Sequence, residues 1–530
     1  MNKKYAILFY LIALSLHSHS QNIGEFTPIY PGTQTQQLQL PETHSFQLLI
    51  KTGDALTGGG TMPVNSDFTG YSPTAGSSVN GYVAVNSENV PGDVTVLDVQ
   101  YNETSKLWNV SSSVSVDFPA SVTTWANCSG TVTSWGTTIT CEETDIAVDL
   151  NADGYKDFGW SIEIDPVTKE VMDYNNDGTP DKLWAMGRMK HENIAIAPDN
   201  KTVYYGNESD QGFVYKFICD NAEDLTAGTL YVMKKTSTTS GVWIQVPNTT
   251  QAERNDVVTF SNGIDAFAHD RVEDVEVGPD GKVYFAVTSW SEIYRFEDTG
   301  DSIVNYEVYV SPGNYNVPSP GGLRSVNFGS PDNLAFDGDN NLWITQDGGD
   351  NHIWIVRPDH TSANPKLEIF ANTPLGCEPT GITFSPDYRF IFISMQHTGT
   401  SNLAAMTDAA GVVVDFNKDA TLVIARNENL TESDHGFNPP TNGTSSIDNN
   451  QLEQFSVYPN PSKGVFNIEH RFLTTPNVKV FDMTGKMMDV ATNTTNNGKI
   501  IFNLQGKNKG VYLIEITTGE ETYYERIILE

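Results

Sequence analysis

The 530-residue sequence has few cysteines, few basic residues and no long apolar run after its first residues. Four cysteines are too few and too scattered for a disulfide framework, so at most one or two bridges are expected. Lys and Arg total 31 against 66 Asp and Glu, which gives a formal net charge of -35. This charge argues against a nucleic acid or an anionic membrane surface as partner, because both are negative. No transmembrane segment is predicted.

The first residues have the pattern of a secretory signal. Lys3 and Lys4 form a basic start, Tyr5 to Leu16 is apolar, and a small-residue cleavage region precedes Gln21. The apolar run is too short to span a bilayer as a transmembrane helix. We therefore expect residues 1–20 to be a signal peptide and the mature protein to be an exported monomer.

A weak repeat predicts the fold of residues 21–437. Each copy couples an apolar strand to an Asp/Asn/Gly turn and then to an apolar, aromatic strand, and the turns begin near residues 197, 278, 336 and 385. Repeated strand pairs of this kind are typical of radial β architecture. The sequence therefore predicts an all-β fold, a β-propeller with six blades and with insertions between them.

The strands that precede these turns carry acidic residues near their beginnings: Glu192, Glu273, Asp332 and Glu378. Equivalent positions on successive blades face the same axial funnel, so these carboxylates are expected to converge and to offer oxygen ligands to cations. The alternative is that they are ordinary turn residues.

A second candidate site is the strand that ends in Thr140-Cys141-Glu142-Glu143. Strand alternation places Cys141 and Glu143 on one side and Glu142 on the other. A thiolate beside carboxylates suits a transition metal, with oxygens left over for a hard cation. The alternative is a disulfide between Cys141 and Cys128, with solvated glutamates.

Two Asp-rich loops, residues 149–157 and 173–181, have oxygen ligands at alternate positions and a glycine for the turn. They resemble the first half of an EF-hand loop, and we expect structural calcium loops. The alternative is two polar hairpin turns.

Residues 438–452 have the composition of a linker, and residues 453–530 read as a small β-sandwich. Its short motifs are Tyr458-Pro459-Asn460-Pro461, Gly464, the segment 480–485 (VFDMTG) and the segment 510–514 (GVYLI). In this order they resemble the C-terminal sorting domain of type IX secretion cargo. The resemblance implies recognition by the type IX secretion machinery, passage across the outer membrane, and a secreted or cell-surface location.

The region from Asn80 to Gly399 resembles the PhoX-type alkaline phosphatases. The motifs that carry the resemblance are 135–143, 187–192, 214–217, Arg271-Val272-Glu273-Asp274, 331–337, 341–345, 378–381 and 396–399. The family is a β-propeller enzyme that hydrolyses phosphate esters with a pair of ferric ions and with calcium.

Carried over by motif, the resemblance implies a role for each candidate residue. Cys141 is the expected thiolate ligand of iron, Glu192 and Glu273 are carboxylate ligands, and Arg271 contacts the phosphate. Glu142, Asp332 and Glu378 are assigned to calcium or to supporting roles. For Arg271 the alternative is an ion pair with Glu273 or Asp274.

Two other functions remain open at this point. A calcium-dependent lactonase-type propeller needs one cation held by Glu, Asn and Asp, a set available in Glu192, Asn333 and Asp332, and it needs no thiolate. A non-catalytic propeller that binds glycans or a surface partner needs calcium only for stability. Iron content would distinguish a lactonase-type propeller from a phosphatase. Hydrolase activity would distinguish either enzyme from a non-catalytic binding propeller.

Overall fold

The computed structural model describes residues 22–436, 455–470, 476–482, 486–488, 490, 492–494, 499–518 and 521–530. The predicted signal peptide (1–20) and the predicted linker (438–452) lie outside these residues. The chain divides into two compact units, residues 1–437 and 438–530, and each is described by itself.

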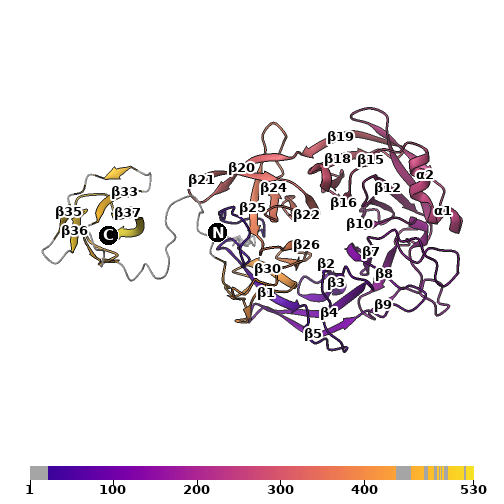
Figure 1. Ribbon diagram of the computed structural model, residues 1–530, viewed down its shortest axis with the longest axis horizontal. Helices are drawn as coiled ribbons and strands as arrows, with labels where there is room; N and C mark the ends of the chain where they lie inside the picture. The colour runs from indigo at the N-terminus through magenta and orange to yellow at the C-terminus, as the bar shows by residue number, and fades with distance from the viewer. Residues whose placement is uncertain are drawn as a thin grey trace, which may run out of the picture. The chain divides into compact units, whose positions relative to one another are not determined.

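The first unit is built of antiparallel strand groups arranged radially (Figure 1). The first groups are β2 (Ser66–Pro73), β3 (Asn80–Ser87), β4 (Asp93–Asn102) and β5 (Leu107–Ser115), then β6 (Asn127–Val132), β7 (Thr138–Glu142), β8 (Ser161–Asp165) and β9 (Glu170–Val171). The next are β10 (His191–Ile196), β11 (Thr202–Asn207), β12 (Gly212–Cys219), β13 (Gly228–Lys235) and β14 (Gly241–Val246), then β16 (Val272–Val277), β17 (Val283–Val287), β18 (Glu292–Asp298) and β19 (Ser302–Val310). The last are β22 (Pro331–Phe336), β23 (Leu342–Gln346), β24 (His352–Val356) and β25 (Leu367–Asn372), then β26 (Glu378–Phe384), β27 (Phe390–Gln396), β30 (Ala420–Arg426) and β1 (His44–Lys51).

The predicted β-propeller is confirmed by this arrangement. Strands β2, β6, β10, β16, β22 and β26 are innermost, and each contacts the next around a closed ring. The N-terminal strand β1 pairs with β30, from His44 opposite Arg426 to Lys51 opposite Ala420, and so completes the last group. The last group therefore combines the N-terminal strand with three strands from the end of the unit, which closes the ring. The predicted blade number stays a prediction, because two groups are joined into one sheet through β14 and β19.

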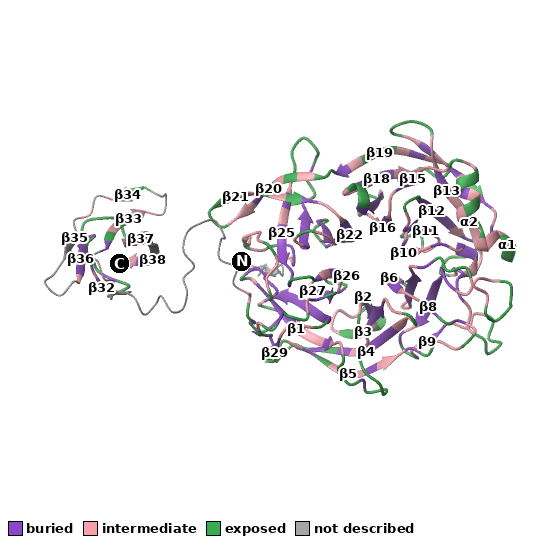
Figure 2. Cartoon of the chain, in the orientation of Figure 1, coloured by how far each residue is buried: buried purple, intermediate pink, exposed green. Residues whose placement is uncertain are grey.

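Most residues of the inner strands are buried (Figure 2), and this holds for acidic residues near their beginnings as well as for apolar ones. Every residue of β27 (FIFISMQ) is buried, and its aromatic side chains pack on Tyr71 and Trp108 from neighbouring strands. This packing of β-branched and aromatic side chains between the groups holds the inner strands, and the side chains at their ends, in fixed positions.

The insertions lie outside the ring of inner strands. Short strands β15 (Ala268–His269), β28 (Met406–Thr407) and β29 (Val413–Val414), the hairpin of β20 (Gly313–Ser319) and β21 (Gly322–Phe328), and helices α1 (Gln251–Asn255) and α2 (Val257–Gly263) belong to them. The Asp-rich loop 149–157 contacts α1, where the Asn255 amide donates a hydrogen bond to the Gly154 carbonyl at 2.9 Å. Both Asp-rich loops are largely exposed, and calcium binding there stays a prediction.

The second unit is the predicted β-sandwich. One sheet contains β31 (Phe455–Tyr458), β32 (Val465–His470), β36 (Ile500–Asn503) and β35 (Thr492–Thr494). The other contains β34 (Met487–Met488), β33 (Asn477–Asp482), β37 (Gly510–Thr518) and β38 (Glu521–Leu529). Phe466, Phe502 and Ile514 are among the residues of the core between them.

Candidate metal centre

The inner strands are bulged near their beginnings. The register shifts between Ser66 and Thr69 in β2 and between Asn127 and Gly130 in β6. The same shift occurs at residues 191–194 in β10, 272–275 in β16 and 331–334 in β22. A bulge breaks the alternation of the strand and re-aims the side chains inside it. The second residue of each strand lies in the bulge, and these residues are Asp67, Cys128, Glu192, Glu273 and Asp332.

Strand β26 departs from this pattern. Its bulge lies between Thr380 and Thr383, which places Gly381 where the other strands carry a ligand-type side chain. A Cβ at Gly381 would lie 2.2 Å from the backbone nitrogen of Thr69, and the residue has a φ of +63°, so a side chain does not fit. The carboxylate of this strand comes instead from its first residue, Glu378.

These side chains line one cavity of about 180 Å³ at the beginning of the inner strands. Its lining consists of carboxylates, one thiol, one guanidinium and one imidazole: Asp67, Glu88, Cys128, Glu143, Glu192, Arg271, Glu273, Asp332, Asp347, Glu378 and His397. Several of the carboxylates are almost completely buried. A buried concentration of like charge with so few cations is stable only with protons or bound cations.

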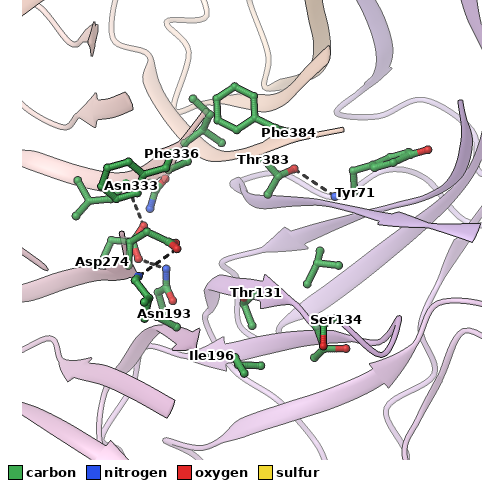
Figure 3. A pocket seen from close by; sticks show the side chains of 18 of the residues that line it. Tyr71, Thr131, Ser134, Asn193, Ile196, Asp274, Asn333, Phe336, Thr383 and Phe384 are labelled. Carbon is green, nitrogen blue, oxygen red and sulfur yellow. Dashed lines mark hydrogen bonds between the residues drawn. The ribbon is translucent and has the colours of Figure 1, made fainter. Parts of the chain in front are cut away.

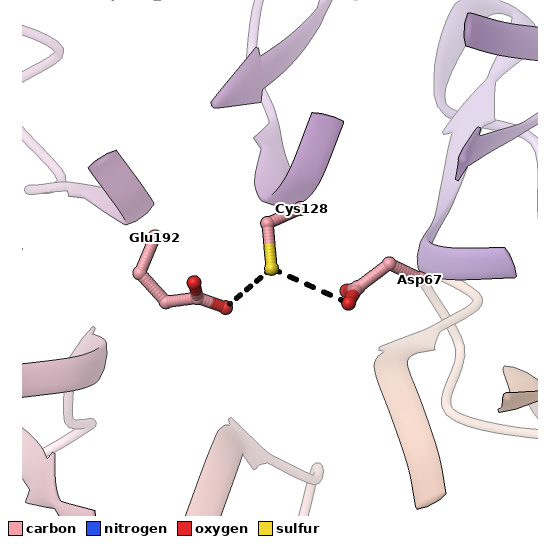
Figure 4. A group of neighbouring side chains, drawn as sticks. All are labelled: Asp67, Cys128 and Glu192. Atoms are coloured by element: carbon pink, nitrogen blue, oxygen red, sulfur yellow. Dashed lines mark hydrogen bonds between the residues drawn. The ribbon is translucent and has the colours of Figure 1, made fainter. Parts of the chain in front are cut away.

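Three combinations of side chains bring their ligand atoms within 4.8 Å of one another. They are Asp67 with Cys128 and Glu192, Glu88 with Cys128 and Glu143, and Glu192 with Glu273 and Asp332. The Cys128 Sγ lies 3.4 Å from Asp67 Oδ2 and 3.3 Å from Glu192 Oε1 (Figure 4). Cys128 and Glu192 therefore connect the combinations into one cluster.

The carboxyl groups of this cluster are strongly perturbed in the metal-free protein. Burial, aided by the charge of Glu88, raises the pKa of Asp67 to about 8. Burial and the neighbouring Glu208 raise the pKa of Glu273 to about 8. Burial and nearby carboxylates raise the pKa of Glu192 and of Asp332 well above the usual range. A cation at the cluster would reverse these shifts, because it favours the ionised form.

Unpartnered oxygens show that the residues present fit a metal. Asp67 Oδ1 and Glu192 Oε2 are buried and accept no hydrogen bond from any described residue. Buried polar atoms normally have a hydrogen-bond partner, so these two oxygens indicate a partner other than a protein donor, such as a metal ion. One soft sulfur donor with several hard oxygen donors is a set for a transition metal together with calcium.

Two basic side chains stand at the edge of the cluster. Arg271 donates a hydrogen bond from Nε to Glu208 and pairs with Glu273, with Nη2 2.8 Å from Oε1. Lys190 Nζ lies 3.4 Å from Glu143 and 3.3 Å from Glu208. The Arg271 side chain is 40% exposed, so part of its guanidinium is free to meet an incoming anion. Arg271 also has a φ of 60°, an unusual conformation for a non-glycine residue and one found at functional sites.

The prediction for Cys141 is wrong. Cys141 is fully buried in the hydrophobic core between strand groups, 3.6 Å from the Ser161 hydroxyl, and does not line the cavity. Strand β7 is the second strand of its group, and the inner strand β6 carries Cys128 to the axis. The alternative disulfide is wrong as well, because all four cysteines, each within the described residues, are free.

The prediction for Glu142 is also wrong. Its carboxylate accepts hydrogen bonds from Lys182, 2.8 Å away, and from the backbone amides of Trp125, Gly159 and Trp160. Both oxygens are occupied by these donors, so Glu142 holds the surrounding loops together and offers no face to the cavity. The next residue, Glu143, lies beyond the strand end and lines the cavity instead.

The predicted convergence of the strand-start acids is seen in the structure. Glu192, Glu273, Asp332 and Glu378 all line the cavity, as does Arg271. Sequence reasoning missed Asp67, Cys128 and Asp347 as cavity residues, although Asp67 and Cys128 occupy the same strand position as Glu192.

A larger cavity of about 810 Å³ lies at the other end of the inner strands (Figure 3). It is lined by the residues that follow the candidate ligands, among them Asn193, Asp274, Glu276 and Asn333. No Lys or Arg is among its described lining residues. Asn333 Oδ1 accepts a hydrogen bond from the Gly381 backbone nitrogen at 2.6 Å, so this side chain is bound to a neighbouring strand.

The fold and the cluster define a β-propeller with a candidate metal centre at one end of its central channel. The family model described as alkaline phosphatase PhoX matches residues 106–399, and the model of a secretion system C-terminal sorting domain matches residues 456–530. The first match covers more than half of the chain. The chain therefore belongs to the PhoX family of alkaline phosphatases, which are metal-dependent hydrolases of phosphate esters.

Solved structures agree with this fold. The structure of Pseudomonas fluorescens PhoX in complex with vanadate, a transition state analogue, matches with a TM-score of 0.59 and 22% identity, covering 76% of this chain and 98% of that chain. A gluconolactonase from Xanthomonas campestris matches with a TM-score of 0.35 and 10% identity, covering 76% of this chain and 99% of that chain. The second similarity is too distant to bear on function. No curated protein sequence matches the chain.

The second unit is a secretion system C-terminal sorting domain, as its sequence motifs predict, and this domain points to handling by a secretion system. Among the helices that the structure describes, none combines the length and the hydropathy needed to cross a bilayer.

Proposed function

We propose that this protein is an exported phosphatase that binds a pair of ferric ions and calcium in the 180 Å³ cavity and releases phosphate from phosphate esters. One observation carries the proposal. Cys128, which lies within the region that matches the PhoX family, is in hydrogen-bonding range of Glu192 from the same region and of Asp67, inside a ring of buried carboxylates.

The donor set supports both kinds of metal. Thiolate suits iron better than calcium, so Cys128, Asp67 and Glu192 would hold iron. Carboxylate oxygens without sulfur suit calcium, so Glu273, Asp332 and Glu378 are the candidates for it, together with Glu192, which both combinations share. When bound, such cations supply Lewis acidity and lower the pKa of a bound water or oxo group.

The protein's own basic groups would bind and orient the substrate. Arg271 is partly exposed beside Glu273, and its planar guanidinium can donate two parallel hydrogen bonds to phosphate oxygens. Lys190, with its side chain 31% exposed, would add a second positive charge from the neighbouring strand end. The Glu208 carboxylate forms ion pairs with both Arg271 and Lys190 and so keeps these two side chains in place before the substrate arrives.

The geometry does not favour a lactonase. That activity needs Asn333 beside Glu192 and Asp332, yet Asn333 lines the larger cavity and not the metal centre. Its oxygen is bound to Gly381 and its nitrogen donates to Asp332 Oδ1 at 3.1 Å. A single-cation site built on these three residues would first have to break the contact with Gly381.

We further infer that the protein is exported to the outside of the cell. The sequence pattern of residues 1–20 and the match to a sorting domain support export in two steps, first by the signal peptide and then by the type IX machinery.

The direct test uses the purified protein without residues 1–20. We expect the protein to contain iron and calcium by elemental analysis and to hydrolyse p-nitrophenyl phosphate. Activity should fall on addition of a calcium chelator and return when calcium is restored. Absence of turnover with every supply of iron and calcium would contradict the proposed activity and favour a non-catalytic binding propeller.

A further inference from the structure

A second ring of side chains lies directly behind the candidate ligands. Because the bulges break alternation, the residue after each ligand also faces the central channel. Asn193 follows Glu192, Asp274 follows Glu273 and Asn333 follows Asp332, and all three are buried and line the larger cavity. The polar groups of this ring contact neighbouring strands.

Asp274 makes the most extensive of these contacts (Figure 3). Its Oδ1 accepts a hydrogen bond from Asn193 Nδ2, and its Oδ2 accepts one from the Leu334 backbone nitrogen at 2.7 Å. Asn193 is on β10 and Leu334 on β22, while Asp274 is on β16 between them. One side chain, only 2% exposed, thus ties together three inner strands of separate groups.

The strands tied by Asp274 are those that carry Glu192, Glu273 and Asp332, one of the combinations able to hold a cation. Asn193 is one residue from Glu192, and Leu334 is two residues from Asp332. The backbone of the bulges is not fixed by a regular ladder, so the spacing of these ligands depends on such cross-strand contacts. Groups behind metal ligands commonly orient them in this way.

We propose that Asp274 is the positioning residue that sets the spacing of Glu192, Glu273 and Asp332 for cation binding. This proposal shares one assumption with the proposed function, namely that Glu192, Glu273 and Asp332 hold a cation. It assigns no contact between Asp274 and substrate. Asp274 acts through the backbones of the three ligands.

The chemistry of Asp274 suggests a conservative variant that separates geometry from charge. In Asp274→Asn, the amide oxygen can accept from Leu334 and the amide nitrogen then faces Asn193. Asn193 Oδ1 has no partner among the described residues, so a flip of the Asn193 amide would restore the second hydrogen bond. Asp274→Ala loses both hydrogen bonds.

A matched control comes from the far end of β22. Asp337 is also buried, at 3% exposure, and accepts hydrogen bonds from Asn341 and from Trp343 Nε1 at 2.9 Å. Asp337→Ala removes a carboxylate of similar burial and hydrogen bonding, but it lies in the turn that follows the strand and outside the metal centre.

The test measures metal binding by the whole mature chain, independently of catalysis. Free calcium is titrated against metal-depleted protein while the melting temperature is followed, and iron is measured after dialysis. We expect Asp274→Ala to need roughly 10- to 100-fold more calcium for half-saturation. Asp274→Asn should stay near the wild type, and Asp337→Ala should lower the melting temperature of the metal-depleted protein with unchanged calcium dependence.

If Asp274→Ala does not fold, Asn193→Ala provides a second variant, because it removes only one of the two hydrogen bonds. It should raise the calcium concentration needed for half-saturation by a smaller factor.

Wild-type calcium affinity in Asp274→Ala would overturn the proposal, as would equal affinity losses in Asp274→Ala and Asp337→Ala. A wild-type protein that binds no metal would overturn it too. A wild-type protein that binds metal but hydrolyses no ester would refute the proposed function alone, and the affinity loss in Asp274→Ala would still support the positioning role.

Discussion

The two ends of the central channel are built from the same inner strands, yet they differ in size and in charge. The cavity at the strand beginnings is the smaller, about 180 Å³ against about 810 Å³. It gathers the thiol, most of the carboxylates and Arg271, whereas the described lining of the larger cavity is apolar or uncharged polar apart from Asp274, Glu276 and Asp337. The volume of a cavity therefore does not locate the chemistry of this molecule. The reactive site is better located by a group of buried carboxylates that has too few Lys or Arg side chains to neutralise it.

The difference in charge between the two cavities follows from where the acidic residues lie along each inner strand. The bulged position carries Glu192 in β10 and Asp332 in β22, while three residues later the channel-facing positions carry Ala195 and Ala335. In these two strands an acidic side chain occurs where a cation can neutralise it, and a small side chain occurs where the strands approach one another. In β16 the later position carries Glu276, which lines the larger cavity.

Among variants that leave the metal ligands in place, the largest effect on activity is expected from Arg271→Ala. Loss of charged hydrogen bonds to the substrate should lower kcat/KM for p-nitrophenyl phosphate by roughly 10- to 100-fold, because each such bond contributes about 1.5–3 kcal/mol. Arg271→Lys should give an intermediate loss, since an ammonium keeps the charge but not the planar pair of donors. Steady-state kinetics and metal content measured on the same preparations check this.

Arg389 provides the matched control at the other end. It also pairs with two carboxylates, Asp387 and Glu103, but it lies in the turn between β26 and β27. Arg389→Ala should leave kcat/KM within about twofold of the wild type. Equal losses in both variants would mean that Arg271 acts through stability and not through substrate binding.

A second effect concerns pH and metal removal. The pKa values of Asp67 and Glu273 are raised to about 8 without metal, whereas the unfolded chain loses these protons near pH 4. The metal-free folded state therefore holds more protons between about pH 4 and 8, and its free energy of unfolding falls as the pH rises through this window. Bound cations favour the ionised carboxylates and remove this loss.

The difference in melting temperature between metal-loaded and chelated protein should accordingly be larger at pH 8 than at pH 5. Differential scanning calorimetry at the two pH values measures it. A difference that narrows with rising pH would show that the clustered carboxylates do not hold the metal.

The smallest effect is expected at the far end, from Glu276→Gln. Burial raises the pKa of Glu276 to about 7, so above that pH the folded protein contains an ionised carboxylate in an unfavourable place. Removing the charge should raise the melting temperature at pH 8 by about 1–2 °C and by less at pH 5. Metal content and kcat/KM should not change, and a loss of either would extend the functional site along the channel.

Sequence reasoning found the fold and half of the site for a physical reason. Glu192, Glu273 and Asp332 precede apolar strands that lead into Asp/Gly turns, and this combination recurs along the chain. Strand β2 (SDFTGYSP) and strand β6 (NCSGTV) occupy the same place in the ring without that apolar signature. Their ligand-type residues, Asp67 and Cys128, were therefore missed.

The error at Cys141 has a different cause. Alternation describes a regular strand, and it correctly separated Cys141 from Glu142, but it does not say whether a strand is first or second in its group. Cys141 lies on the second strand, where its side of the sheet packs into the core. Glu143, just past the strand end, leaves the alternation and reaches the cavity. These are properties of the assembled sheet, and local sequence does not encode them.

The most direct test of the metal centre compares the two cysteines. Cys128→Ala and Cys141→Ala each remove one buried thiol from neighbouring strands of the same group, so their general cost to stability should be similar. We predict that Cys128→Ala loses bound iron and phosphatase activity together, while Cys141→Ala retains both. Iron retained at the wild-type level in Cys128→Ala, or lost in Cys141→Ala instead, would contradict the assignment of Cys128 as the thiolate ligand.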